Sequence, residues 1–220
     1  MKKFVKIVIG IVAVLFAALL IVGALSRDKI EIPAGFAGQY VDVNGVKIRY
    51  VQKGNGKDIL LIHGTPGSIE DWNPVIDTLA QKFRVTAYDR PANGFSSAEG
   101  CDFSVAYNAK TAFALIDTLK LSKPLVVGHS YGAAVAMNMA TENDPRVKGF
   151  VVESSSAYSY HARKTMLGRL IRLPLVGRGF SVIISSVAGG MIDKGMKMAF
   201  HPNEDAIPSG FIDMKKMMIA

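Results

Sequence analysis

Short apolar runs alternate with helical segments between residues 59 and 153, and this alternation limits the folds open to the chain more than any other feature. Residues 59–62 are entirely apolar and flanked by glycines, as is typical of a strand buried on both faces of a parallel sheet. Strands separated by helices of ten to sixteen residues indicate βαβ crossovers. The sequence therefore predicts an α/β fold with a mostly parallel sheet and helices on both faces. Further strands are expected at 84–88, 125–127 and 147–153, with helices at about 72–81, 104–119 and 131–142.

A β-hairpin precedes this alternating pattern. Residues 40–43 and 46–51 alternate in polarity around Asn44 and Gly45, the dipeptide that type I′ turns prefer. Residues 30–38 carry one proline and two glycines with little periodicity, which is typical of a linker. We therefore expect a linker over 30–38 and a folded core over 39–156.

The first 29 residues have the composition of a membrane anchor. Residues 7–25 contain no charge and no hydroxyl group, and about 20 such residues form a helix that crosses the hydrocarbon core. Lys2, Lys3 and Lys6 precede the run, so the positive-inside rule places the N-terminus in the cytoplasm and the rest of the chain outside it. A cleaved signal peptide is the alternative, and the protein would then be secreted.

The charge and cysteine content exclude several classes of function. The chain has 26 basic and 18 acidic residues, a net charge of +8, but no run of five or six like charges. The basic residues lie among leucine, isoleucine and methionine, a pattern that favours a membrane surface over nucleic acid. Cys101 is the single cysteine, which excludes an intrachain disulfide and a cysteine-based metal site. No metal ion or organic cofactor is implied.

A candidate nucleophile lies between a predicted strand and a predicted helix. Residues 128–132 read Gly-His-Ser-Tyr-Gly, which fits the G-x-S-x-G pattern with Ser130 at its centre. A serine at a sharp strand-to-helix turn needs small neighbours, because other parts of the backbone approach closely there. The sequence predicts Ser130 as the catalytic nucleophile.

A second motif follows the strand at 59–62. Residues 63–67 read His-Gly-Thr-Pro-Gly, and acyl transfer needs backbone N–H donors where negative charge develops. We expect the N–H groups of Thr65 and Tyr131 to form an oxyanion hole, although a simple connecting turn would have the same composition. We expect His63 to order the loop by hydrogen bonding to backbone rather than to act in catalysis.

Four motifs in register resemble the α/β-hydrolase-fold family of the cap-bearing type, which includes esterases, epoxide hydrolases, haloalkane dehalogenases and carbon–carbon bond hydrolases. They are 63–67, Trp72, the segment 89–96 (Asp-Arg-Pro-Ala-Asn-Gly-Phe-Ser) and 128–132. Ala92 departs from the pattern, because the family commonly has glycine there. The resemblance implies a helical cap over residues 157–220. A serine nucleophile, instead of an aspartate, favours ester, thioester or carbon–carbon cleavage.

The resemblance also implies an acid and a histidine after later strands, and the sequence shows neither. His161 and His201 are the only histidines beyond Ser130, and neither follows a strand. We therefore expect the last strands of the sheet to be missing, with an unpaired edge and open apolar surface. The chain would be an N-terminal piece or a degenerate copy of such a hydrolase.

The predicted cap contains amphipathic helices broken at Gly189-Gly190 and at Pro202, and one weak strand pattern at 181–184. Its leucines and methionines predict either an apolar lid for a lipophilic acyl substrate or an ordinary packed lid helix. The sequence thus favours a membrane-anchored serine hydrolase. A truncated or non-catalytic membrane protein of the same fold is the alternative, and the oligomeric state is left open.

Overall fold

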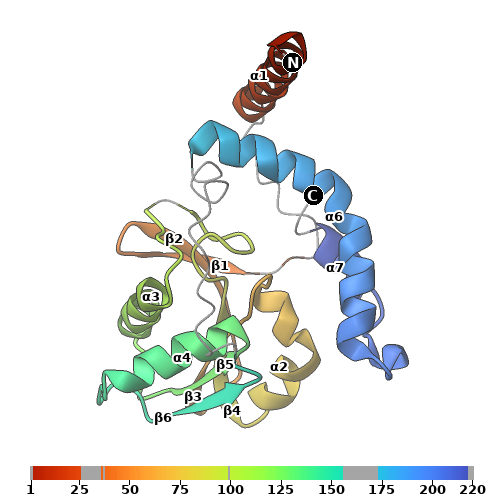
Figure 1. Cartoon of the computed structure of the whole chain (residues 1–220). Helices are drawn as coiled ribbons and strands as arrows, with labels where there is room; N and C mark the ends of the chain where they lie inside the picture. Colours follow the sequence, from red (N-terminus) through yellow and green to blue (C-terminus); the bar gives the residue numbers. More distant parts are fainter. Residues whose placement is uncertain (1, 26–35, 37, 99, 156–172, 218–220) are drawn as a thin grey trace. The chain divides into compact units, whose positions relative to one another are not determined.

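A computed structural model of the chain describes residues 2–25, 36, 38–98, 100–155 and 173–217 (Figure 1). The chain divides into two compact units, one formed by residues 30–160 and the other by residues 1–29 together with 161–220. The division of the chain into anchor, linker, core and cap, with the limits set from the sequence, stays a prediction.

The first unit is built on a six-stranded sheet with the order β1-β2-β4-β3-β5-β6. β1 and β2 pair antiparallel, β2 pairs antiparallel with β4, and the remaining pairs are parallel. The predicted, mostly parallel sheet is confirmed. The strands are β1 (Gln39–Val43), β2 (Val46–Lys53), β3 (Lys57–Ile62), β4 (Phe83–Tyr88), β5 (Leu125–His129) and β6 (Gly149–Glu153).

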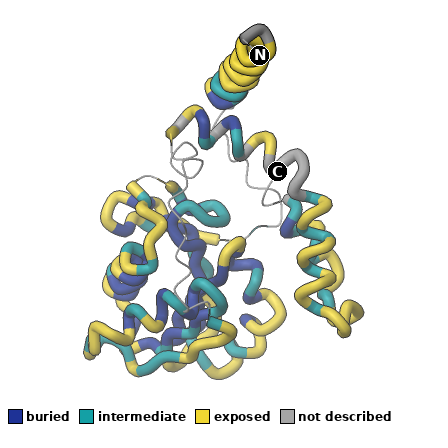
Figure 2. Tube along the Cα trace, viewed as in Figure 1, coloured by how far each residue is buried: buried dark blue, intermediate teal, exposed yellow. Residues whose placement is uncertain are grey.

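Helices cover both faces of this sheet, as the sequence predicts. Along β3, Leu60 and Ile62 belong to a core cluster that includes residues of α3 (Val105–Thr118) and α4 (Tyr131–Thr141). Ile59 and Leu61 belong to a second cluster with residues of the 3-10 helix η1 (Ile69–Trp72) and of α2 (Asn73–Ala80). Alternate side chains of a strand point to opposite faces, so the all-apolar sequence of β3 follows from its central position (Figure 2).

The hairpin turn has the predicted geometry. Asn44 and Gly45 both have positive φ, at 54° and 83°, as a type I′ turn requires. β6 lies at the other edge of the sheet, and Val151 and Val152 are each 44% exposed there although they point to opposite faces. Within the described residues the sheet therefore has an open edge with apolar surface.

The second unit contains three α-helices in its described part: α1 (Lys2–Leu25), α6 (Pro174–Phe200) and α7 (Phe211–Met217). Residues 4–25 of α1 are long and apolar enough to cross a membrane, and a signal sequence would pass the same test. The expected break at Gly189-Gly190 and the weak strand at 181–184 are both wrong, because α6 runs through them. Each glycine costs a helix only about 1 kcal/mol relative to alanine, which a helix of 27 residues can absorb. Pro202 follows the end of α6, as predicted.

Candidate active site

Ser130 lies at a sharp turn between β5 and α4. Its backbone has φ 54° and ψ −114°, outside the regions that non-glycine residues normally adopt. Flanking glycines permit the turn: a Cβ atom on Gly128 would lie 2.2 Å from the carbonyl oxygen of Gly132. A Cβ atom on Gly132 would lie 2.1 Å from the carbonyl oxygen of Ile62 in β3. This is the geometry that the G-x-S-x-G pattern predicts.

The loop after β3 lies against this turn. A Cβ atom on Gly64 would lie 3.0 Å from the Cβ atom of Ser130, so the 63–65 backbone and the serine are direct neighbours. Among the described residues, nothing accepts a hydrogen bond from the N–H of Thr65 or of Tyr131, and nothing bonds the Ser130 hydroxyl. Two unpartnered N–H groups beside a free hydroxyl can stabilise an oxyanion that forms on that hydroxyl's substrate. Their role as an oxyanion hole remains a prediction.

His63 is fully buried and bonded to backbone, as predicted. Its Nε2 accepts a hydrogen bond from the N–H of Arg90 at 3.0 Å. The ring proton is therefore on Nδ1, which donates to the carbonyl oxygen of Gly64 at 2.8 Å. His63 thus joins the loop after β3 to the loop after β4.

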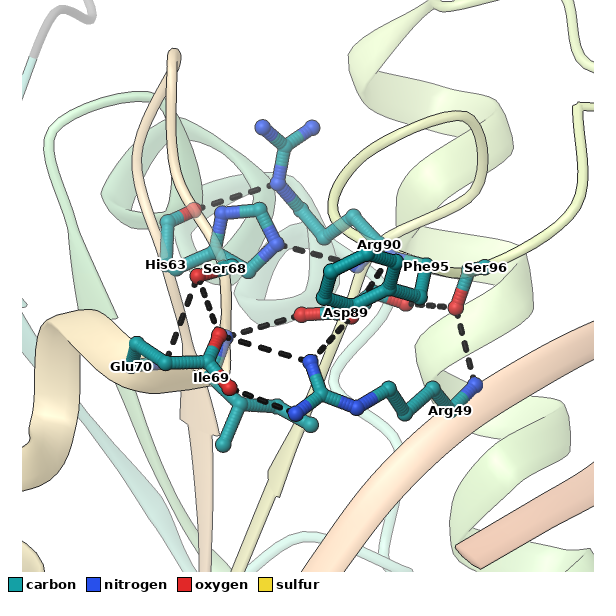
Figure 3. A network of polar contacts seen from close by, with 9 residues as sticks. All are labelled: Arg49, His63, Ser68, Ile69, Glu70, Asp89, Arg90, Phe95 and Ser96. Atoms are coloured by element: carbon teal, nitrogen blue, oxygen red, sulfur yellow. Dashed lines mark hydrogen bonds and ion pairs between the residues drawn. The ribbon is translucent and has the colours of Figure 1, made fainter. Parts of the chain in front are cut away.

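A buried network of charges supports the same two loops (Figure 3). Arg49 on β2 pairs with Glu70 at 2.5 Å and with Asp89 at 3.0 Å, and its side chain is only 1% exposed. Burial raises the pKa of the Asp89 carboxyl, while the N–H groups of Phe95 and Ile69 and the charge of Arg49 act in the opposite direction. The sequence motif 89–96 pointed to Asp89, but no sequence signal identified Arg49 as its partner.

The loop after β4 explains the glycine that the family commonly has at position 92. Ala92 has φ 59°, a left-handed conformation that costs residues with a side chain about 1–2 kcal/mol. Gly94 in the same loop also has positive φ, and a Cβ atom there would lie 2.3 Å from the Asp89 carboxyl. Ala92 therefore adopts a conformation that glycine adopts without this cost.

Among the described residues, no histidine ring and no carboxylate forms a hydrogen bond with the Ser130 hydroxyl. His201 follows α6 in the other unit, where its side chain is 73% exposed and lies 3.9 Å from Glu204. His161 lies outside the described residues. The described part of the chain also contains no group of three or more potential metal ligands. Among the described residues, the candidate nucleophile and the candidate oxyanion donors therefore have no base in contact with them.

Comparison with known proteins decides the family. The sequence profile of the alpha/beta hydrolase fold family matches residues 58–181, more than half of the chain. The chain belongs to this family. Residues matched include the loop after β3, the loop after β4 and the turn at Ser130.

Curated relatives have diverse activities. An acetyltransferase component of the acetoin cleaving system of Cupriavidus necator is 36% identical over 121 residues, which are 54% of this chain and 32% of that protein. A soluble epoxide hydrolase of a Corynebacterium species is 35% identical over 101 residues, 46% of this chain and 35% of that protein. The chain spans about a third of the length of each.

Solved structures share the fold. A meta-cleavage product hydrolase has a TM-score of 0.52 and 27% identity, over 54% of this chain and 45% of that one. An epoxide hydrolase solved without ligand has a TM-score of 0.69 over 83% of this chain and 67% of that one, and its 21% identity shows the fold alone. These likenesses agree with the α/β-hydrolase fold that the sequence motifs predict.

Proposed function

We propose that this protein is a membrane-anchored serine hydrolase that cleaves an ester, thioester or related acyl bond. The observation that carries the proposal is the strained turn at Ser130, where neither the hydroxyl nor the neighbouring N–H groups of Thr65 and Tyr131 have a partner among the described residues. A serine nucleophile favours acyl chemistry over the aspartate-dependent opening of epoxides or displacement of halides.

In the proposed reaction the Ser130 oxygen attacks the acyl carbonyl and loses its proton to a base. The carbonyl oxygen becomes negative and accepts hydrogen bonds from the two N–H groups, each of which is worth about 10²–10³-fold in rate. The acyl–serine ester forms as the leaving group departs with a proton, and water then releases the acid. This chemistry needs no metal ion or organic cofactor.

The apolar helix α1 supports a location at the membrane. Its residues 4–25 would tether the unit formed by residues 30–160 to the bilayer, with the N-terminus in the cytoplasm and that unit exported. A tethered enzyme meets substrates that partition into lipid, so we infer a small, lipophilic acyl substrate. Cleavage of α1 as a signal sequence would instead give a secreted protein.

A second candidate is a non-catalytic membrane protein of the same fold. It is favoured by one observation: the described residues supply no base to Ser130. A triad serine without its histidine retains only about 10³–10⁴-fold acceleration over water, from oxyanion stabilisation and binding.

Fluorophosphonate labelling separates the two candidates, because these reagents report an activated serine. We expect no labelling of the 220 residues alone, and we expect a form extended by a carboxyl-terminal segment with an acid and a histidine to label at Ser130. Ser130→Ala should abolish that labelling, while Ser122→Ala, an exposed serine before β5, should not change it.

An unlabelled extended form, or labelling that persists in Ser130→Ala, would refute the serine hydrolase and favour the non-catalytic protein. Strong labelling of the 220 residues that His201→Ala removes would place the base in the other unit.

A further inference from the structure

The peptide group between Gly64 and Thr65 is held from one side by two donors. Its carbonyl oxygen accepts a hydrogen bond from Arg90 Nη2 and another from His63 Nδ1, both at 2.8 Å. Its N–H group is the candidate oxyanion donor of Thr65 and has no acceptor among the described residues. Because a peptide group is planar, two bonds that fix the carbonyl also fix the direction of the N–H.

Arg90 also contacts the second oxyanion donor. Its guanidinium lies over the ring of Tyr131, 4.5 Å from the ring centre, and the N–H of Tyr131 is the other candidate oxyanion donor. The Tyr131 hydroxyl donates to the carbonyl oxygen of Phe103 at 2.7 Å, which holds the ring in place. One side chain therefore touches both residues whose N–H groups flank Ser130.

No carboxylate of the described residues pairs with the charge of Arg90. The residue is 2% exposed, and in the part of the chain that the structure describes its side chain bonds only neutral oxygens. These acceptors are the carbonyl oxygens of His63 and Gly64, the Thr65 hydroxyl, and the amide oxygens of Asn93 and Asn108. Figure 3 shows the guanidinium above His63, apart from the Arg49 network. A buried cation without a counter-charge favours negative charge nearby.

We propose that Arg90 is a positioning residue for both oxyanion donors, and that it acts on Thr65 through the Gly64 carbonyl together with His63. Hydrogen bonds accepted by a peptide carbonyl polarise the peptide group and strengthen its N–H as a donor. The positive charge of Arg90 also favours an anion at the N–H groups of Thr65 and Tyr131. This inference rests on the proposed function, because it concerns the same site, but it makes a separate statement about anion binding.

Anion binding can be measured without catalysis. In the whole chain in lipid nanodiscs, selective ¹⁵N labelling of threonine and tyrosine reports the amides of Thr65 and Tyr131, and sodium butyrate at constant ionic strength is the anion probe. We expect butyrate to shift both amide signals in the wild type. Arg90→Gln should raise the butyrate Kd about tenfold, as expected for the loss of one hydrogen bond to a charged group. It should also remove the shift of the Thr65 amide signal.

Two further variants separate positioning from simple structural support. Arg90→Lys keeps the charge but loses the planar fork and the ring stacking, so the butyrate Kd should lie between those of the wild type and Arg90→Gln. Arg146→Gln is the matched control, because Arg146 also stacks on a ring, that of Phe113, but is 41% exposed and paired with acids. It should leave the Kd unchanged. If Arg90→Gln does not fold, the butyrate Kd of Arg90→Lys is compared with that of the wild type instead.

Three results would overturn the inference: no shift of either amide in the wild type, the same Kd in the wild type and a folded Arg90→Gln, or the same Kd in the wild type and Arg90→Lys. Butyrate binding that depends on Arg90, together with an extended form that fluorophosphonate never labels, would keep this inference and refute the proposed catalysis.

Discussion

Replacement of Arg49 by methionine should be among the most destabilising single substitutions in the unit formed by residues 30–160. Arg49 lies between the carboxylates of Glu70 and Asp89, and the three groups carry a net charge of −1 in a buried site. Methionine fills similar space but leaves two buried carboxylates without their cation. Loss of one partner from a buried ion pair costs about 3–5 kcal/mol, a large part of the ~5–15 kcal/mol that stabilises a typical domain.

This cost should depend on pH in a definite direction. Burial already raises the folded-state pKa of Asp89 above its unfolded value, and without Arg49 the neighbouring Glu70 carboxylate disfavours ionisation of Asp89 further. Groups with raised folded-state pKa values destabilise the protein most when ionised. The deficit of Arg49→Met relative to the wild type should therefore be greatest at neutral pH. It should shrink as the pH falls through the folded-state pKa of Asp89 toward its unfolded value, near 4.

Trp72 provides the assay, because it is the only tryptophan and is 7% exposed in the core on the α2 face. Urea unfolding followed by its fluorescence, in detergent at several pH values, gives the free energy of unfolding of each variant. Arg146→Met is the control for loss of an exposed, acid-paired arginine, and it should cost less than about 1 kcal/mol. A deficit for Arg49→Met that is below 1 kcal/mol, or that does not change with pH, would refute the electrostatic reasoning.

Other perturbations test the backbone and the anchor. Gly132→Ala puts a Cβ atom 2.1 Å from the Ile62 carbonyl oxygen and should cost about 1–3 kcal/mol or prevent folding, as judged by the same unfolding curve. Gly189→Ala, in α6 with nothing within 4 Å of its Cβ position, should instead increase helix stability by up to about 1 kcal/mol. Ala92→Gly relieves a φ of 59° and should raise the free energy of unfolding by about 0.5–1 kcal/mol; an unchanged value would contradict the strain. The protein should stay with membranes in alkali, whereas recovery of a soluble form that begins near Leu25 would indicate a cleaved signal.

Much of the fold was predictable because its signals are local. The turn at Asn44 and Gly45 depends on two residues that adopt positive φ readily, and the central strand β3 is visible as four consecutive apolar residues. The position of Ser130 follows from a five-residue pattern whose glycines have steric reasons within the same turn. Each of these features is determined by residues that are near one another in the chain.

The partners of Arg49 and Arg90 were not predictable, because most of them are distant in the sequence. Arg49 follows an alternating pattern that resembles a half-exposed hairpin strand, yet its carboxylate partners lie 21 and 40 residues away. Arg90 has three of its acceptors 25 to 27 residues earlier in the chain. The course of α6 through Gly189-Gly190 was missed for a different reason, since glycine signals a break only where the helix is short or unsupported.

The two oxyanion candidates act through the main chain, and this decides how the site will respond to mutation. Almost any residue at position 65 or 131 still presents an N–H, so a scan of side chains will score Thr65 and Tyr131 as tolerant even if both are indispensable to the reaction. Proline alone removes the donor. The positions that do not tolerate substitution will be those that shape the backbone without touching a substrate, such as Gly64, Gly132 and Arg90. In mutational data the site will therefore be marked by the residues around the two donors and not by the donor residues themselves.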